Sequence, residues 1–260
     1  MNLSECQALV TGGAVRIGRA IAEMLADAGC GLAIHYRRSA DEATALAERL
    51  GGKTRVTLVR GDLSSAAECR RIIDESWRST GGFNILINNA SVFHKDDLAS
   101  ATAEKLDAEL RVNFLAPVHL TRAFAEKLCP ELFGAATDAE SGQAAPRGKA
   151  IHLLDRRIAG VDVSCVPYEL SKKMLAEYTR QSALELGPYI AVNGVAPGAI
   201  LPPRSVGEGT GDPVRDWAGP TPLRGPCGPD AVAAAVRFLL EADGMTGQTI
   251  FVDNGRHLIR

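Results

Sequence analysis

The sequence predicts an α/β protein in which helices cover both faces of a doubly wound parallel sheet of about seven strands. Short apolar runs that read as buried strands alternate along the chain with longer segments of helical periodicity. The first of these strands is followed at once by a glycine-rich turn and an amphipathic helix. Polar residues follow several strands, at the sheet edge where open parallel sheets bind their ligands. We therefore expect a Rossmann-type fold.

Length and composition favour a single domain over residues 1–260. A chain of this length can bury a substantial core, and 46% of its residues are hydrophobic. The formal net charge of -2 provides no basic field for a nucleic acid, and no apolar run is long enough to cross a bilayer. The first residues lack the layout of a signal peptide. We expect a cytoplasmic protein that acts on a small-molecule substrate, with no nucleic acid and no membrane as partner.

The six cysteines form no C-x-x-C pair and no metal-ligand spacing, so we expect reduced thiols and no metal site. Two stretches of the chain lack periodicity. Residues 134–148 are small and polar, which predicts a mobile surface loop inside the domain. Residues 199–220, above all 204–217, are rich in Gly and Pro and are predicted to form a lid over the substrate.

A strand, a glycine turn and a helix follow one another at the start of the chain. Residues 7–11 read as the strand, the turn holds Gly12 and Gly18, and Ile17 begins the apolar period of the helix. Glycines let the backbone approach a pyrophosphate, and the helix N-terminus adds unpaired N–H groups with a favourable dipole. This succession favours a dinucleotide site over the alternative, an ordinary tight turn.

Arg16 occupies a position of this turn where glycine is more common. A long cation here has two roles open to it: pairing with the pyrophosphate, or reaching into the substrate space above it. The alternative is an arginine that faces solvent, which is less favoured because the position opens the helix beneath the ligand.

The end of the second strand, predicted over residues 31–35, indicates which dinucleotide binds. The chain there reads His35, Tyr36, Arg37, Arg38 and Ser39. An enzyme that uses NAD usually has an acidic residue here, whereas an arginine accommodates a 2′-phosphate. A charge-assisted bond contributes about 1.5–3 kcal/mol, and about 1.4 kcal/mol is tenfold in affinity, so Arg38 and Ser39 alone could set a preference for NADP. A basic patch that caps the next helix is an alternative that does not exclude this role.

Asp62 and Leu63 follow a third strand, predicted over residues 55–59. Asp62 could accept a hydrogen bond from the adenine amino group while the Leu63 N–H donates to the ring. Alternatively, Asp62 caps the helix that begins near residue 65.

A fourth strand, predicted over residues 83–88, runs into a loop that places a small residue and a hydroxyl over the cofactor. The loop reads Asn89, Ala90, Ser91, Val92 and Phe93. Phe93 could stack on a flat heterocycle, or it could merely anchor the loop.

The stretch from Asp155 to Lys172 carries the predicted chemistry. A buried strand over residues 150–154 ends in Asp155, and Tyr168 and Lys172 lie four residues apart at the start of a helix that reads through residue 186. We expect the ammonium group beside the phenol to lower the pKa of Tyr168 and make it a usable general acid. Taken alone, the spacing is more typical of an exposed helix that begins with an aromatic residue.

A helix predicted over residues 104–113 is interrupted before Pro117. Asn113, at the interruption, is a structural amide or a kink element in most settings. Here we expect it to hold a water that relays protons to Lys172.

The remaining elements complete the sheet and its helices. A strand over residues 190–196 is followed by a turn that we expect beside the nicotinamide. The residues of this turn that we expect to contact the cofactor are Pro197, Gly198 and Ile200. A helix over residues 229–241 and a strand over residues 247–255 come last.

Over the whole chain, these motifs resemble the short-chain dehydrogenase/reductase superfamily. The residues that carry the resemblance are Thr11-Gly-x-x-x-Arg16-x-Gly18, Asp62, Asn88-Asn-Ala90, Asn113, Tyr168-x-x-x-Lys172 and Pro197-Gly198. Members usually have a serine thirteen residues before the tyrosine to bind the substrate carbonyl, and here that position is Asp155. That departure, together with Arg16 and residues 35–39 and 88–93, looks like the pteridine reductase branch.

The resemblance implies NADPH-dependent reduction of a pterin, from a dihydropterin or dihydrofolate to the tetrahydro form and potentially also from the oxidised pterin. It implies that the pterin stacks between the nicotinamide and Phe93, that Arg16 and Ser91 make polar contacts, and that Tyr168 and Asp155 supply a proton. It also implies a homotetramer, in which Arg260 matches an arginine that reaches a neighbouring active site. A frayed terminus is the alternative for that residue.

An imine-type nitrogen needs a proton as the neighbouring carbon takes hydride, and a carboxyl beside a phenol can supply it. For this role Asp155 must keep a proton near neutral pH, so we expect partial burial to raise its pKa against the pull of Lys172 and Arg16. Two other functions stay open: an NADPH-dependent carbonyl reductase of a ketone or 3-oxoacyl thioester, and a catalytically silent NADP-binding protein.

The candidate site residues form three overlapping sets. The catalytic set is Asp155, Tyr168, Lys172 and Asn113. The set for NADPH or NADP is Gly12, Arg16, Ile17, Gly18, His35, Tyr36, Arg37, Arg38, Ser39, Asp62, Leu63, Asn89, Ala90, Ser91, Tyr168, Lys172, Pro197, Gly198 and Ile200. The substrate set is Arg16, Ser91, Phe93, Asp155 and Tyr168.

Overall fold

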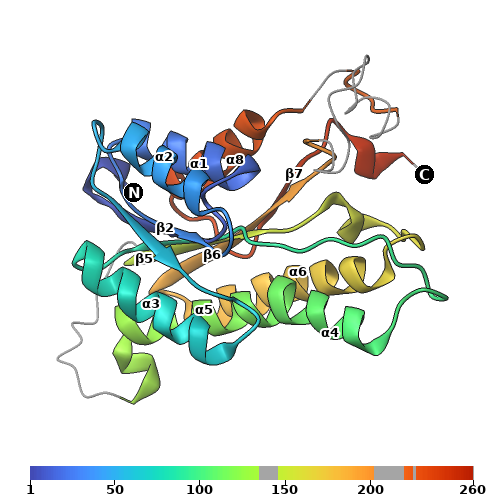
Figure 1. Ribbon diagram of the computed structural model, residues 1–260, viewed down its shortest axis with the longest axis horizontal. Helices are drawn as coiled ribbons and strands as arrows, with labels where there is room; N and C mark the ends of the chain where they lie inside the picture. The colour runs from blue at the N-terminus through green and yellow to red at the C-terminus, as the bar shows by residue number, and fades with distance from the viewer. Residues whose placement is uncertain (135–145, 202–219, 225–226, 260) are drawn as a thin grey trace.

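Seven parallel strands form one sheet, in the order β3-β2-β1-β4-β5-β6-β7, in the part of the chain that the structure describes (Figure 1). This structure is a computed structural model that describes residues 1–134, 146–201, 220–224 and 227–259. The strands are β1 (Gln7–Val10), β2 (Gly31–Tyr36), β3 (Val56–Arg60), β4 (Ile85–Asn88), β5 (Gly148–Leu153), β6 (Ile190–Pro197) and β7 (Thr249–Val252). The predicted fold class is confirmed.

Helices cover both faces of this sheet (Figure 1). The α-helices are α1 (Arg16–Asp27), α2 (Ala40–Leu50), α3 (Ala66–Thr80), α4 (Ala103–Leu110), α5 (Ala116–Leu128), α6 (Val166–Leu186) and α8 (Pro229–Glu241). Helices α1, α2 and α8 share one buried cluster with the sheet, whereas α3, α5 and α6 pack against its other face. Helix α4 lies against α6. Within the described ranges, none of these helices combines the length and the apolar character that a membrane span requires.

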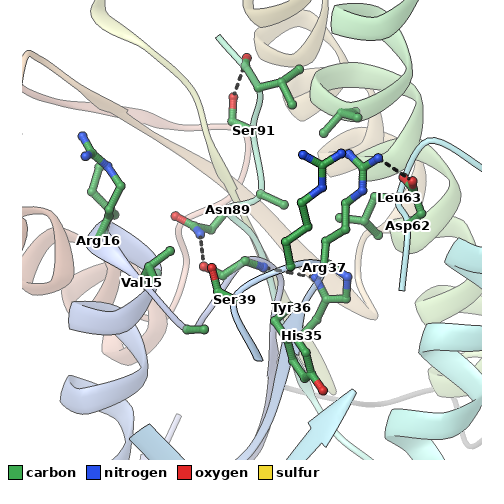
Figure 2. Close-up of a pocket in the computed structure, with 18 residues that line it drawn as sticks. Val15, Arg16, His35, Tyr36, Arg37, Ser39, Asp62, Leu63, Asn89 and Ser91 are labelled. Atoms are coloured by element: carbon green, nitrogen blue, oxygen red, sulfur yellow. Dashed lines mark hydrogen bonds and ion pairs between the residues drawn. The ribbon is translucent and has the colours of Figure 1, made fainter. Parts of the chain in front are cut away.

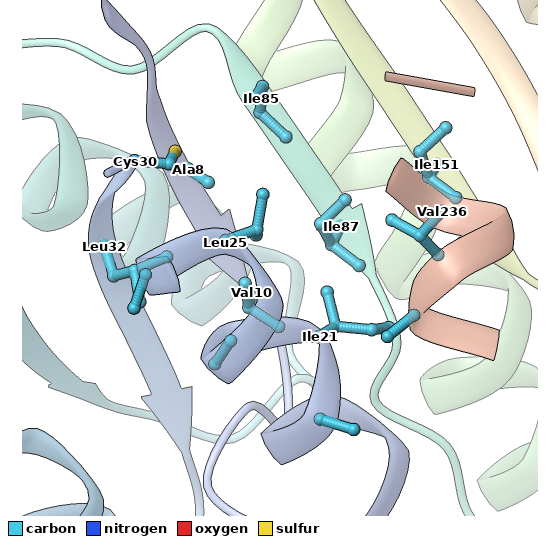
Figure 3. Packing of buried hydrophobic residues seen from close by; sticks show 14 of the residues in the cluster. Ala8, Val10, Ile21, Leu25, Cys30, Leu32, Ile85, Ile87, Ile151 and Val236 are labelled. Carbon is cyan, nitrogen blue, oxygen red and sulfur yellow. The ribbon is translucent and has the colours of Figure 1, made fainter. Parts of the chain in front are cut away.

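The core between α1, α8 and the sheet consists of aliphatic side chains (Figure 3). Ile21 and Leu25 of α1 and Val236 of α8 are fully buried against Val10 and Ile87 of the central strands. Burial of each such side chain stabilises the folded state by about 1.5–3 kcal/mol. Because both faces of the sheet are covered, its strands read as continuous apolar runs rather than as alternating patterns. This packing fixes the strand ends that carry the polar residues.

The strands are added to the sheet in one direction from β1 to β3 and in the opposite direction from β4 to β7. From β1 the chain continues to β2 and β3 on one side, and β4 returns to the other side, where Val10 pairs with Ile87. A crevice opens at such a switch point, outside the carboxyl ends of the strands. The glycine turn after β1 and the loop after β4 therefore meet, as the polar residues at those strand ends suggested.

Three details differ from the sequence-based expectations. The mobile loop predicted over residues 134–148 extends too far, because Gly148 belongs to β5 and pairs with Ile190 of β6. Residues 135–145 of this predicted loop lie outside the described part of the chain. The interruption near Asn113 is a five-residue π-helix (Arg111–Leu115) that joins α4 to α5. The N-cap of α3 is Ser65, which accepts from the Glu68 N–H, so the alternative of Asp62 as the cap is wrong.

Acid should weaken the fold through His152, which is fully buried between the hydroxyls of Thr121 and Thr179. Burial lowers the pKa of His152 to about 3, with a further contribution from Lys172. The unfolded chain takes up this proton near pH 6.5, so the stabilisation is complete above that pH and is lost as the pH falls toward 3. Between pH 7 and pH 5, His152 should contribute about 2 kcal/mol to the stability lost in urea unfolding, and His152→Gln should remove that part of the loss. Equal pH dependence in the two proteins would contradict this.

Candidate functional site: a dinucleotide cavity and an Asp-Tyr-Lys cluster

In the turn after β1, two parts of the backbone approach each other so closely that only glycine fits between them. Gly12 has a φ of +59°, and a Cβ added to Gly18 would lie 2.2 Å from the Gly12 carbonyl oxygen and 2.5 Å from Nδ2 of Asn89. Thr11 Oγ1 accepts hydrogen bonds from the N–H groups of Asn89 and Ala90, at 2.9 and 3.0 Å. These contacts join the end of β1 to the end of β4, and they leave the backbone of the turn open to a ligand.

Arg16 begins α1 with a φ of 56°, in the left-handed region that favours glycine. This explains why glycine is the more common residue at this position. The strain costs about 1–3 kcal/mol, which suggests that the side chain has a function. The guanidinium donates to the Leu201 carbonyl at 3.2 Å, and Arg16 lines both cavities described below. Both roles considered for Arg16 therefore stay open.

A cavity of about 510 Å³ follows the glycine turn and the end of β2 (Figure 2). It collects the predicted cofactor residues from β1, β2, β3 and β4. These residues are Gly12, Arg16, Ile17, Gly18, His35, Tyr36, Arg37, Arg38, Ser39, Asp62, Leu63, Asn89, Ala90 and Ser91. The glycine cradle, the N-terminus of α1 and the arginines fit a dinucleotide with an additional phosphate.

His35 supports the glycine turn from below, a role that the sequence did not indicate. Its Nδ1 accepts from the Gly12 N–H and its Nε2 donates to the Gly61 carbonyl, both at 3.2 Å. Burial lowers the pKa of His35 to about 4, so the imidazole is neutral at physiological pH. His35 therefore contributes shape, and no charge, to the cavity.

Arg37 forms an ion pair with Asp62 at 2.8 Å across the outer part of the cavity, which Figure 2 shows. Both side chains are more than a third exposed, so the pair contributes at most about 1 kcal/mol. Asp62 also accepts from the Ser64 N–H, which together with Arg37 lowers its pKa. Because so weak a pair opens easily, Arg37 can turn toward a phosphate.

A second cavity of about 220 Å³ adjoins the first, at the carboxyl ends of β5 and β6. Arg16, Ile17, Asn89 and Ser91 line both cavities. The other predicted residues that line the second cavity are Phe93, Asp155, Tyr168, Lys172, Pro197, Gly198 and Ile200. Residues 202–219, which hold most of the predicted lid, lie outside the described part of the chain, as does Arg260.

Tyr168 donates a hydrogen bond to Oδ2 of Asp155 at 3.1 Å. The two residues are only 7% and 8% exposed. Burial, reinforced by the charge of Asp155, raises the pKa of Tyr168 well above its usual value. The expectation that this pKa is lowered is wrong for this structure, because burial and the charge of Asp155 outweigh the Lys172 ammonium, which lies 5.8 Å from the ring centroid and donates to the Leu153 carbonyl at 2.7 Å. Tyr168 therefore keeps its proton at neutral pH and is a donor.

Lys172 is buried on the same helix face as Tyr168, as their spacing predicted. Burial lowers the pKa of Lys172 to about 8, although Asp155 and Glu109 pull it upward. Lys172 is thus a group that can change its charge near physiological pH.

Asn113 fixes the loop after β4 through its amide. Its Oδ1 accepts from the Ser91 hydroxyl at 2.9 Å and from the Val92 N–H at 2.8 Å, and its Nδ2 donates to the Val92 carbonyl at 2.9 Å. The same nitrogen also contacts Glu109 and Ser171. With the side chain so engaged, the predicted water that relays protons to Lys172 stays a prediction.

The sequence reasoning missed Glu109, which is 1% exposed. Its Oε1 accepts from the backbone N–H and from Nδ1 of His94, both at 2.9 Å. Glu109 and Asn113 together hold the loop on both sides of Phe93, whose ring meets Tyr168 edge-on at 4.7 Å between centroids. A carboxylate one helical turn before Asn113 was the available signal.

Arg157 was also missed. It forms an ion pair with Asp155 at 3.2 Å and lines the second cavity. Asp155 lies two residues after the end of β5 and is the N-cap of a short 3₁₀ helix (Arg156–Ala159). This turn brings Arg157 back to the carboxylate.

Gly18→Ala should weaken NADPH binding at least tenfold, because the added Cβ would overlap the backbone carbonyl of Gly12 and force the turn apart. Gly52→Ala is the matched control, since nothing lies within 4 Å of a Cβ there. Fluorescence titration with NADPH measures both affinities. Equal affinities in the two variants would show that the turn does not hold the cofactor.

Comparison with known proteins identifies the family. The family model described as enoyl-(acyl carrier protein) reductase matches residues 13–257. The chain is 32% identical to a ketoacyl reductase of the granaticin polyketide synthase of Streptomyces violaceoruber, over 97% of this chain and 96% of that protein. It is 30% identical to pteridine reductase 1 of Leishmania tarentolae, again over 97% and 96%.

A similar solved structure is that of FolM alternative dihydrofolate reductase 1 from Brucella suis in complex with NADP. It matches with a TM-score of 0.87 and 30% identity, over 99% of this chain and 97% of that chain. The matched sequences, the sheet order and the Tyr168–Lys172 pair all indicate the same family. The chain therefore belongs to the short-chain dehydrogenase/reductase superfamily of oxidoreductases.

Proposed function

We propose that this oxidoreductase reduces a pterin, a dihydropterin or dihydrofolate, to its tetrahydro form. The observation that carries the proposal is the buried hydrogen bond from Tyr168 to Asp155 at the second cavity. The resemblance to the superfamily implies that most members have a serine where this chain has Asp155, and a hydroxyl is suited to a ketone oxygen. A carboxyl paired with a phenol is suited to a ring nitrogen that gains a proton.

The cofactor is NADP(H). The solved relatives from Brucella are complexes with NADP, and here the first cavity presents Arg37, Arg38 and Ser39 after β2. An arginine at this place accommodates the 2′-phosphate that distinguishes NADP from NAD. When bound, NADPH supplies the hydride.

Reduction of a C=N bond adds hydride to carbon and a proton to nitrogen. Tyr168 faces the cavity and holds its proton at neutral pH, so the Asp155–Tyr168 pair supplies that proton. The nitrogen takes the proton as the neighbouring carbon takes hydride, and the pair then regains a proton from solvent. Low exposure keeps water from competing for these hydrogen bonds.

The lining of the second cavity suits a flat heterocycle. Phe93 is 38% exposed and stands edge-on to Tyr168, so one ring face is accessible for stacking. Arg16 and Ser91 line the junction of the two cavities and offer polar contacts to the edge of such a ring. Pteridine reductase 1 and the FolM structures, each about 30% identical to this chain, support the same substrate class.

An NADPH-dependent carbonyl reductase acting on a ketone or 3-oxoacyl thioester is the second candidate. The ketoacyl reductase of Streptomyces violaceoruber, which is 32% identical to this chain, favours it. Asp155 argues against it, since a carboxylate beside a carbonyl oxygen repels the negative charge that develops there. The intact Tyr168 and Lys172 likewise argue against a catalytically silent NADP-binding protein.

Three further features belong to this proposal. Family resemblance supports a homotetramer in which Arg260 reaches a neighbouring site. The Gly- and Pro-rich composition of residues 204–217 supports a substrate lid over residues 199–220. The charge and the unpaired cysteines agree with a place in the cytoplasm.

Asp155→Ser should lower the turnover of dihydrobiopterin with NADPH about 100-fold, because a general acid–base partner typically contributes about 10²–10⁴-fold. NADPH affinity should stay largely unchanged, since Asp155 does not line the first cavity, which holds the glycine turn and Arg37, Arg38 and Ser39. Asp27→Ser, which removes an exposed carboxylate paired with Lys53 at the end of α1, is the control.

Acetoacetyl thioester is assayed beside dihydrobiopterin. Unaltered pterin turnover in Asp155→Ser would overturn the assignment of Asp155. A wild-type protein that reduces the thioester and no pterin would establish the second candidate instead.

A further inference from the structure

Arg157 touches three components of the second cavity at once. Its backbone N–H donates to Oδ1 of Asp155 at 2.8 Å, and its Nη1 lies 3.2 Å from both carboxylate oxygens. The guanidinium carbon lies 5.5 Å from the centroid of the Phe93 ring and 6.0 Å from that of Tyr168. One cation therefore contacts the carboxylate and both aromatic rings.

The position of Arg157 is fixed from its other side. Its Nε donates to Oδ2 of Asp162 at 2.7 Å, and Asp162 in turn accepts from the backbone N–H and the hydroxyl of Ser164. The Arg157 side chain is 13% exposed and that of Asp155 is 12% exposed. A planar guanidinium held at both ends is already organised for its hydrogen bonds, so little entropy is lost in keeping Asp155 in place.

The charges around Asp155 come from several elements. They are Arg156, Arg157, Asp162, Lys172, Glu109 and Arg16. Among the described residues, Arg157 is the one cation that forms an ion pair with Asp155. Lys172 donates to the Leu153 carbonyl, and Arg16 donates to the Leu201 carbonyl.

We propose that Arg157 is a positioning residue that holds Asp155 in place through their ion pair, with Oδ2 aimed at the Tyr168 hydroxyl. The shared proton then resides on Tyr168, and Tyr168 delivers it to the substrate. This inference rests on the proposed function for its role in turnover. The expectation that Asp155 itself keeps a proton near neutral pH stays a prediction.

Carboxyl-carbon NMR of protein labelled with ¹³C-aspartate tests the inference without any substrate, once Asp155→Asn has identified the Asp155 signal. An opposite charge within about 4–6 Å displaces a carboxyl titration by about 1–3 pH units. Arg157→Met keeps the apolar stem and removes the charge, so the Asp155 midpoint should rise by at least about one unit. Arg157→Lys should restore most of the difference.

Arg156→Met is the matched control, since it removes the same charge one residue away from a side chain that, in the described contacts, does not bond to Asp155. In this variant the titration midpoint of Asp155 should move much less than in Arg157→Met. If Arg157→Met does not fold, Arg157→Gln takes its place. Equal midpoints in the Arg156 and Arg157 variants would overturn the inference.

Kinetics separate this inference from the proposed function. The acid limb of kcat/KM for dihydrobiopterin should move to higher pH in Arg157→Met by the same amount as the NMR midpoint, with NADPH affinity unchanged. A wild-type protein that does not turn over pterins would defeat the proposed function, and the NMR result would still decide the role of Arg157.

Discussion

The hydrogen bond between Tyr168 and Asp155 is the interaction on which the site depends. Its partners come from separate elements, Asp155 from the end of β5 and Tyr168 from the first turn of α6. The bond forms because the packed sheet fixes the strand end, while the Val166 N–H, bonded to the Asp96 carbonyl, helps to fix the helix start. The chemistry of the second cavity follows from this one contact.

Burial gives that contact its effect. In water the phenol and the ammonium would titrate near 10, but here burial raises the pKa of Tyr168 and lowers that of Lys172 to about 8. The phenol is thus a secure proton donor, and the lysine can change its charge near neutral pH. Arg157 supplies the charge that balances Asp155 in this poorly hydrated place.

The sequence predicted the fold, most element bounds and most of the residues that line both cavities, because each rests on a local signal. Apolar periodicity placed α8, and a glycine turn between a strand and a helix placed the phosphate loop. The sequence did not predict side-chain contacts that form only when distant elements pack together. Arg157 and Glu109 read as ordinary charged residues until a 3₁₀ turn and a helix face bring them to Asp155 and His94, and the burial that reverses the expected shift at Tyr168 has no local signature.

A crystal structure of the protein with NADP and a dihydropterin tests the account most directly. The account predicts that the ring stacks on Phe93, with the nitrogen that gains the proton in hydrogen-bond reach of the Tyr168 hydroxyl and Asp155 still bonded to both Tyr168 and Arg157. A complex in which Asp155 turns away from the ring, with no contact to Tyr168 even through water, would contradict it.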